Sequence, residues 1–381
     1  MTRHLMKGCE AFAEATVRAG CHCFFGYPIT PQSEVMEYLS WRLRDFPDGV
    51  FLQAESEVAA INMVYGAAAA GRRAMTSSSG PGISLMQEGL SYLAGAELPC
   101  LVANFCRTGP GLGGVEGSQC DYLQATRSGG HGGYRLLTLA PSTVQEMVHL
   151  TVLAFELAEQ YRTPAMIFSD GILAQLAEPV SFDDLLVVTH PKPWAVTGAD
   201  GRARNRIPRH FFSEASETDG LDPETVARYR AMTGKGPATP LIEAERLNLT
   251  LAEKYRRMAK EEARWEVIGD GTDFLLVAFG TIARVCEEVL DWLAGEGIRA
   301  RLFRPITIFP FPSEALARAA AGVERVHVVE MNEGQMIDDV RIAVGREKPI
   351  GFYGRTAGGV LRVGEIGRAI TGALARREIH A

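Results

Sequence analysis

Short apolar runs and longer amphipathic stretches alternate through the first 170 residues of the chain. The amphipathic stretches repeat apolar residues at helical spacing over residues 8–19, 31–44, 55–71, 82–95 and 142–161. The apolar runs have the length of buried strands and cover residues 21–25, 50–53, 74–76, 100–105, 136–139 and 164–168. This alternation predicts an α/β domain with a doubly wound parallel sheet. Functional residues are expected in the loops at the carboxyl ends of its strands.

The alternation stops between residues 188 and 240, where six prolines and many charged residues interrupt the pattern. A long amphipathic helix is predicted at 241–264, and a second α/β unit starts near residue 272. Its strands are predicted at 273–279, 299–303, 325–330 and 350–353, and its helices at 282–296, 335–345 and 362–376. We therefore predict a domain over 1–187, a linker with a long helix over 188–264, and a second domain over 265–381.

Composition and charge exclude several classes of protein. The chain has 381 residues, is 46% hydrophobic and 22% charged, and carries a formal net charge of -7. Its densest basic stretch, 254–264, is interleaved with glutamates, so nucleic acid is not expected as a partner. No uncharged run reaches the roughly 18 residues of a membrane span, and we expect a cytoplasmic protein. The seven cysteines have irregular spacing, which predicts reduced thiols and no metal-ligand set.

The turn Gly-Tyr-Pro-Ile-Thr-Pro at residues 26–31 is the first candidate for chemistry. Its prolines and glycine restrict the backbone and predict Thr30 as the N-cap of the next helix, with Pro31 at the first helical position. A hydroxyl and free N–H groups at a helix start can hold an anion. The pattern alone favours the alternative, in which Thr30 only caps the helix.

Glu57 is the second candidate, at the start of a helix that is apolar nearly all round. Such a helix must be buried, so Glu57 is predicted at the rim of a core. A carboxylate in that setting tends to act through its proton. A favourable contact with the helix dipole is the alternative, and the sequence alone supports both equally.

Arg107 and His131 belong to the glycine-rich region after strand 100–105. An arginine at the carboxyl end of a strand, followed by a glycine-rich loop, suits bidentate binding of a carboxylate. A surface ion pair is the alternative. The loop at 108–117 lacks the spacing of a Walker A or dinucleotide phosphate loop. His131 stands between two glycine pairs, where it can approach a substrate or a partner.

Together these segments resemble the alpha subunit of the 2-oxoacid:ferredoxin oxidoreductases. The resemblance rests on GYPITPQSE (26–34), QAESEVAAINMVYGAAAAG (53–71), MTSSSGPGISLMQEGLSYLAGAELP (75–99), RTGPGLGG (107–114), SQCDYLQA (118–125), LLVAFGT (275–281) and EMNEGQM (330–336). The motifs AESEVAAINMVYGAAAAG and GGHGGYR are most similar to the 2-oxoisovalerate, or branched-chain, type.

The resemblance implies a division of labour between subunits. This chain would supply a thiamine diphosphate pyrimidine-binding domain and a transketolase C-terminal-like domain. A beta subunit would bind the diphosphate through Mg²⁺ and carry 4Fe-4S clusters. Gamma and ferredoxin-like delta subunits would help with coenzyme A and with electron transfer to ferredoxin. The complex would be a dimer of heteromers. The sequence agrees, since after Gly269-Asp-Gly271 the next asparagine is the distant Asn332, and cluster-binding cysteines are absent.

The resemblance also implies roles for residues. Glu57 would hold N1′ of the thiamine aminopyrimidine, and Thr30 and Arg107 would hold the substrate carboxylate. The reaction would convert a 2-oxoacid and coenzyme A to acyl-CoA, CO₂ and a reduced acceptor. Cys120 stands where many relatives have glycine, and Gly133 where they have an acid.

These departures leave phenylglyoxylate and 2-oxoglutarate as alternative substrates. A non-redox thiamine diphosphate enzyme subunit, either a decarboxylase or transketolase-like, is the alternative class. The joint presence of Glu57, Thr30 and Arg107 disfavours a non-catalytic scaffold. The lack of a phosphate fingerprint disfavours a free-standing Rossmann dehydrogenase.

Overall fold

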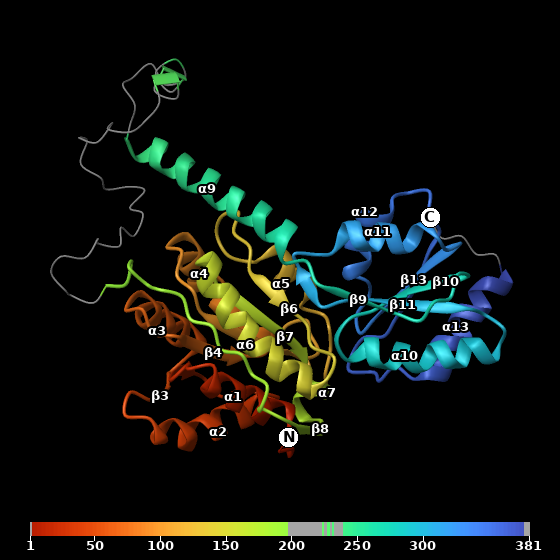
Figure 1. Cartoon of the computed structure of the whole chain (residues 1–381), viewed down its shortest axis with the longest axis horizontal. Helices are drawn as coiled ribbons and strands as arrows, with labels where there is room; N and C mark the ends of the chain where they lie inside the picture. The colour runs from red at the N-terminus through yellow and green to blue at the C-terminus, as the bar shows by residue number, and fades with distance from the viewer. Residues whose placement is uncertain (1, 197–222, 225–226, 229–230, 232–238, 377–381) are drawn as a thin grey trace.

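The computed structural model shows two α/β units side by side, each built around its own sheet (Figure 1). It describes residues 2–196, 223–224, 227–228, 231 and 239–376. Most of the predicted irregular segment at 188–240 therefore lies outside the described residues. Within the described part, no helix is both long enough and apolar enough to cross a bilayer.

The first sheet has seven strands in the order β12-β6-β7-β5-β4-β2-β3, all parallel to their neighbours except β12. Its strands are β2 (Cys23–Gly26), β3 (Val50–Gln53), β4 (Ala74–Ser78), β5 (Leu101–Cys106), β6 (Leu137–Leu139), β7 (Ala165–Asp170) and β12 (Thr307–Phe309). β4, β5, β6 and β7 are buried at every position, as expected for parallel strands covered on both faces.

The connections between these strands determine which helices cover each face. The helices are α1 (Gly8–Arg18), α2 (Ser33–Arg42), α3 (Glu57–Ala69), α4 (Gly80–Gly95) and α6 (Val144–Tyr161). Right-handed crossovers place α2 and α6 on one face and α3 and α4 on the other, and α1 packs with α2 and α6 while α3 packs with α4. The neighbouring strands β2 and β4 continue into helices on opposite faces of the sheet, so the direction in which the chain winds reverses between them. The loops after these two strands therefore diverge and form the switch-point crevice of the sheet.

The second sheet has the order β14-β13-β10-β11-β9, with β9 antiparallel and the others parallel. Its strands are β9 (Trp265–Ile268), β10 (Phe274–Val277), β11 (Ala300–Pro305), β13 (Arg325–Glu330) and β14 (Ile350–Gly354). Helices α10 (Gly280–Gly295) and α13 (Val363–Arg376) pack together, and α11 (Ser313–Ala321) packs with α12 (Met336–Val344) on the other side (Figure 1). Winding reverses here between β10 and β13.

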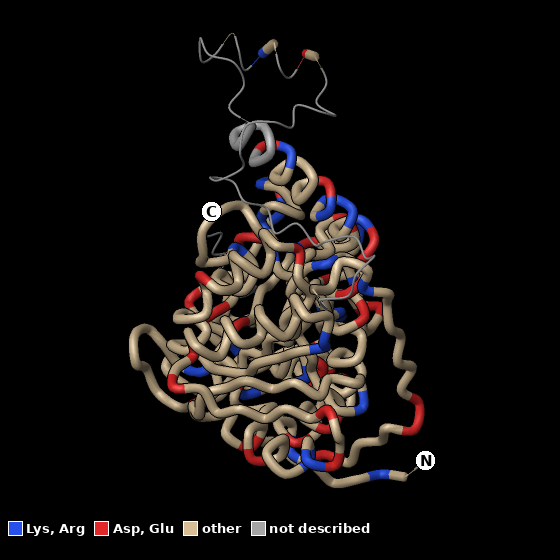
Figure 2. Tube along the Cα trace, turned by 90° about the vertical axis from the view of Figure 1, so that its left-hand side faces the viewer, with Lys and Arg blue, Asp and Glu red and all other residues tan. Residues whose placement is uncertain are grey.

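Helix α9 (Thr239–Glu261) projects from the first unit, and basic and acidic residues are interspersed along its described part (Figure 2). Its carboxyl-terminal half is anchored. Lys254 Nζ contacts a Glu97 carboxylate oxygen at 3.0 Å, and the Tyr161 hydroxyl donates to Glu261 at 2.7 Å. The remaining elements are β1 (His4–Lys7), η1 (Leu43–Asp45), α5 (Tyr122–Arg127), α7 (Gly171–Gln175) and β8 (Ala177–Val180).

The observed elements confirm the predicted α/β class, but the cap predicted for the helix at 31–44 is wrong. Helix α2 begins at Ser33 with Gln32 as N-cap, so Thr30 does not cap it and Pro31 is not its first residue. The reason is a turn closed by the bond from the Gln32 N–H to the Ile29 carbonyl (3.1 Å), which uses Thr30 and Pro31 before the helix can start. The division at 1–187, 188–264 and 265–381 stays a prediction, and β12 from the last range completes the first sheet.

His327 in β13 predicts a specific loss of stability in acid. Its ring is 3% exposed, its Nε2 has no hydrogen-bond partner among the described residues, and burial lowers its pKa to about 4. The pKa of an unfolded histidine is about 6.5. Below that pH the unfolded state therefore binds a proton that the folded state does not bind. We expect the free energy of unfolding to be unaffected by His327 above pH about 6.5 and to fall by about 3 kcal/mol towards pH about 4.

Urea unfolding of the chain at pH 7, 6 and 5 measures this loss. His327→Leu should flatten the pH dependence over this range, because leucine cannot take up the proton when the chain unfolds. His4→Leu, which changes an exposed histidine, should keep the wild-type slope. Equal slopes for wild type and His327→Leu would contradict the assignment.

Candidate active site

The loop after β2 and the loop after β4 are tied together at the first switch point. Gln32 is fully buried, and its Oε1 accepts a hydrogen bond from the Ser77 hydroxyl at 2.6 Å. Its Nε2 donates to the Tyr27 carbonyl at 3.2 Å. Gln32 thus fixes the turn at residues 26–31 against β4. Gln32 was not predicted as a site residue, although it lies within the motif GYPITPQSE.

Glu57 is the first residue of α3 and is 5% exposed. The preceding Ser56 caps the helix by accepting a hydrogen bond from the Ala59 N–H at 3.3 Å. Glu57 makes no hydrogen bond or ion pair with any other residue that the structure describes. A largely buried carboxylate that no protein group satisfies can accept a hydrogen bond from a ligand that supplies a donor.

The carboxylate of Glu57 lies against the start of α4. A Cβ atom at Gly82 would stand 2.5 Å from Glu57 Oε1 and 2.0 Å from Ser78 Oγ, so any larger residue would displace both groups. The hydroxyls of Thr76, Ser78 and Ser79 are also buried, and none has a partner among the described residues. The start of α4 therefore gathers a carboxylate and several free hydroxyls, which can bind a polar ligand.

Arg107 directly follows β5 and is buried. Its Nη1 donates to the Thr30 carbonyl at 2.9 Å and its Nη2 to the Leu112 carbonyl at 3.0 Å, while its buried Nε has no partner among the described residues. The fold thus brings Thr30 and Arg107 together through the backbone of Thr30. Their predicted contact with a substrate carboxylate stays a prediction. His131 is exposed in a bend, and its predicted loop contact likewise stays a prediction.

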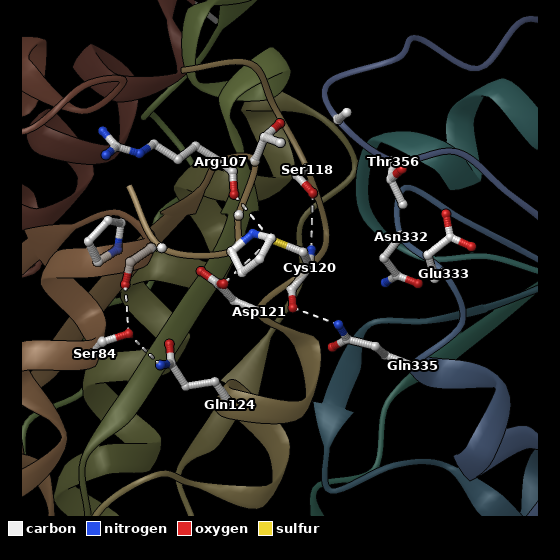
Figure 3. A pocket seen from close by; sticks show the side chains of 17 residues that line it. Ser84, Arg107, Ser118, Cys120, Asp121, Gln124, Asn332, Glu333, Gln335 and Thr356 are labelled. Carbon is white, nitrogen blue, oxygen red and sulfur yellow. Dashed lines mark hydrogen bonds between the residues drawn. The ribbon is translucent and has the colours of Figure 1, made fainter. Parts of the chain in front are cut away.

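A cavity of about 690 Å³ lies between the two units beside Arg107. Figure 3 shows Cys120 and Asp121 of the first unit facing Asn332, Glu333 and Gln335 of the second unit across this space. The glycine-rich loop forms another wall of the cavity through residues 108–111. A second cavity, of about 440 Å³, is lined by Thr30 and the start of α2.

Gln119, in the loop after β5, joins the first unit to the switch point of the second sheet. Its N–H donates to the Met331 carbonyl at 3.1 Å, and its Oε1 accepts from the Met331 N–H at 3.0 Å. Its Nε2 donates to the Phe279 carbonyl at 2.9 Å. Phe279 and Met331 follow β10 and β13, the two strands at which the second sheet reverses its winding. The cavity therefore lies where the carboxyl edges of both sheets meet.

Glu330 shapes the cavity wall from inside the second unit. Its buried carboxylate accepts hydrogen bonds from the N–H groups of Met336 at 2.8 Å and Ile337 at 3.0 Å, at the start of α12. It also accepts from Asn332 Nδ2 at 2.9 Å, although burial raises the pKa of the Glu330 carboxyl. Glu330 thereby positions the loop that carries Asn332, Glu333 and Gln335 into the cavity.

The models of two protein families match the chain. "Pyruvate flavodoxin/ferredoxin oxidoreductase, thiamine diP-bdg" matches residues 14–198, and "Pyruvate:ferredoxin oxidoreductase core domain II" matches residues 272–366. Ketoisovalerate oxidoreductase subunit VorB of Methanothermobacter thermautotrophicus is 44% identical over 349 residues, which covers 91% of each chain.

Solved structures show the same relationship. The 2-oxoglutarate:ferredoxin oxidoreductase of Magnetococcus marinus, with 2-oxoglutarate, coenzyme A and succinyl-CoA bound, matches with a TM-score of 0.80 at 26% identity. The match covers 97% of this chain and spans 65% of that one. A split-gene transketolase, at 15% identity and a TM-score of 0.57, shares the fold over 98% of this chain and 99% of its own.

These matches confirm the predicted combination of a thiamine diphosphate-binding domain and a transketolase-like domain. The identity to the ketoisovalerate oxidoreductase subunit extends over nearly the whole chain. The chain therefore belongs to the family of 2-oxoacid:ferredoxin oxidoreductases, as a subunit of the alpha type.

Proposed function

We propose that this chain is the pyrimidine-binding subunit of a coenzyme A-acylating oxidoreductase that acts on a branched-chain 2-oxoacid such as 2-oxoisovalerate. The catalytic part of this proposal rests on the position of Glu57, which is buried at the first switch point and whose carboxylate has no partner among the described residues. The substrate is supported by the 44% identity to a ketoisovalerate oxidoreductase subunit, against 36% to a 2-oxoglutarate synthase subunit of Archaeoglobus fulgidus.

The residues around Glu57 fit the aminopyrimidine of thiamine diphosphate. A flat ring with N–H groups matches a carboxylate and free hydroxyls gathered where Gly82 leaves room. When bound, this cofactor supplies a nucleophilic carbon and an electron sink for decarboxylation. Glu57 holds and exchanges the proton at the ring nitrogen N1′. Arg107, with Thr30 beside it, orients the substrate carboxylate.

Partner subunits complete the proposed enzyme. A beta subunit binds the diphosphate with Mg²⁺ and carries 4Fe-4S clusters, and gamma and ferredoxin-like delta subunits help with coenzyme A and with electron transfer to ferredoxin, in a cytoplasmic dimer of heteromers. The packing at residues 269–271 supports this division, because a Cβ at Gly271 would lie 2.4 Å from the Ala300 carbonyl oxygen. This Gly-Asp-Gly is a tight turn packed against the start of β11.

Acyl-CoA formation by the complex that co-purifies with this chain tests the proposal. With coenzyme A, thiamine diphosphate and a one-electron dye, we expect 2-oxoisovalerate to give isobutyryl-CoA. Its kcat/KM should exceed those of pyruvate, 2-oxoglutarate and phenylglyoxylate by at least about tenfold, as pocket contacts of this size allow. A higher kcat/KM with another acid would reassign the substrate. Release of free aldehyde and CO₂ without dye reduction would identify a non-redox thiamine enzyme.

A further inference from the structure

Two cysteines meet at the wall of the cavity between the units. Cys106, the last residue of β5, is fully buried. Cys120 is partly exposed and lines the cavity, where its sulfur is visible in Figure 3. The two sulfur atoms and a carboxylate oxygen of Asp121 all lie within 4.8 Å of one another. The other five cysteines are buried thiols elsewhere in the fold.

The backbone itself holds this pair together. Both thiols contact the same carbonyl oxygen, that of Arg107, at 3.2 Å from Cys120 Sγ and 3.8 Å from Cys106 Sγ. An antiparallel bridge pairs Arg107 with Gly117, and the Ser118 N–H donates to the Cys106 carbonyl at 3.3 Å. These contacts place residues 106–107 beside 117–120 and so bring the two sulfur atoms together.

The two thiols differ in acidity and in access to solvent, as a pair needs if one thiol is to react first. The Cys106 thiol, and after it the Ser118 hydroxyl, lowers the pKa of Cys120 to about 7, against the opposite effects of burial and of the Asp121 carboxylate. Burial raises the pKa of Cys106 well above its usual range. Cys120 is therefore the thiolate near neutral pH, with access to solvent, and Cys106 is a protonated thiol behind it. Peroxide-sensitive cysteines combine these two features.

We propose that Cys120 and Cys106 form a hydroperoxide-sensitive dithiol that closes to an intrachain disulfide at the cavity wall. The Cys120 thiolate attacks a peroxide oxygen, the O–O bond breaks, and a sulfenic acid forms while the leaving oxygen takes up a proton as water. The Cys106 sulfur then attacks the Cys120 sulfur, and the S–O bond breaks as the S–S bond forms. The departing hydroxide leaves as water with the Cys106 proton. The two thiols lose two electrons in total, and hydrogen peroxide is reduced to two waters.

The disulfide changes the wall that carries Arg107. It removes both thiol contacts from the Arg107 carbonyl oxygen, and it ties the end of β5 to Cys120. The backbone of Cys120 also joins the second unit, since its carbonyl accepts from Gln335 Nε2 at 2.7 Å. This chemistry needs neither thiamine diphosphate nor partner subunits, so it can be tested independently of the proposed function.

Peptide mapping by mass spectrometry tests the dithiol in the full-length chain. The reduced chain is treated anaerobically with equimolar hydrogen peroxide. We expect a disulfide between Cys106 and Cys120, seen as a peptide pair that is lighter by two hydrogens, and we expect dithiothreitol to reverse it. Cys106→Ser should stop at a Cys120 sulfenic acid that dimedone traps. Cys120→Ser should leave Cys106 unreacted, and the matched control Cys286→Ser should form the link as wild type does.

The pH dependence of alkylation provides an independent readout. The rate of iodoacetamide modification at Cys120 should rise about tenfold from pH 6 to pH 8 and then level off, as the thiolate fraction of a thiol titrating near 7 requires. Cys106→Ala should move this profile to higher pH, because it removes the neighbouring thiol that lowers the pKa of Cys120. Peroxide that oxidises other cysteines while Cys106 and Cys120 stay free would overturn the proposal. So would an unchanged profile in Cys106→Ala.

Discussion

Replacing Glu57 with glutamine should lower kcat of the assembled complex by at least about a thousandfold, the scale on which general acid–base groups act. Glutamine keeps the shape of the side chain in the space that Gly82 leaves, so the fold and the subunit contacts should survive. It cannot exchange a proton with the ring nitrogen of the aminopyrimidine. Steady-state dye reduction measures the rate, and gel filtration of the complex verifies its assembly.

A matched control separates this role from a merely structural one. Glu55→Gln makes the same chemical change two residues earlier, at an exposed position, and should leave kcat unchanged. If Glu57 served only as a partner of the helix dipole, its neutralisation would cost about 0.3–1 kcal/mol of stability and leave turnover intact. A Glu57→Gln complex with near wild-type kcat would therefore remove Glu57 from the catalytic site.

The sequence predicted the buried strands well because their apolar runs end at turn residues. The run at 100–105, for example, corresponds to β5 at Leu101–Cys106. Four strands, β1, β8, β9 and β12, escaped prediction, and two of them show the physical reason. β9 has the sequence WEVI and is largely exposed, so its apolar pattern is weak. β12 has three residues inside a proline-punctuated run and pairs with β6, which lies far away in the sequence, and local patterns do not encode such a pairing.

The candidate site was predictable where burial follows from periodicity. The apolar helix after Glu57 indicated a residue at the rim of a core, and Glu57 is indeed 5% exposed. Contacts created by long-range folding were not predictable. Nothing in the spacing of Cys106 and Cys120 indicates that they meet, because the bridge between Arg107 and Gly117 brings them together. The docking of Gln119 on Met331 depends in the same way on how the two sheets face each other.

Replacing Arg107 with lysine should lower kcat/KM for the 2-oxoacid by about tenfold to a hundredfold, mainly through KM. Lysine keeps the positive charge but lacks the planar fork that can contact a carboxylate through two N–H groups. The unpartnered Nε indicates that the guanidinium of Arg107 has hydrogen-bonding capacity beyond its contacts with Thr30 and Leu112. Initial rates at varied 2-oxoacid and at varied coenzyme A measure the two KM values separately.

The pattern of the two KM values distinguishes substrate binding from support of the backbone. A carboxylate-binding role for Arg107 predicts a raised KM for the 2-oxoacid with that for coenzyme A unchanged. Arg135→Lys is the control, because Arg135 also donates to a backbone carbonyl, that of Tyr134 at 2.9 Å, but does not line the cavity. If Arg107 only braced the carbonyls of Thr30 and Leu112, both KM values would rise together with a lower melting temperature. A rise in the KM for coenzyme A alone would instead assign the adjoining cavity wall to the thiol substrate.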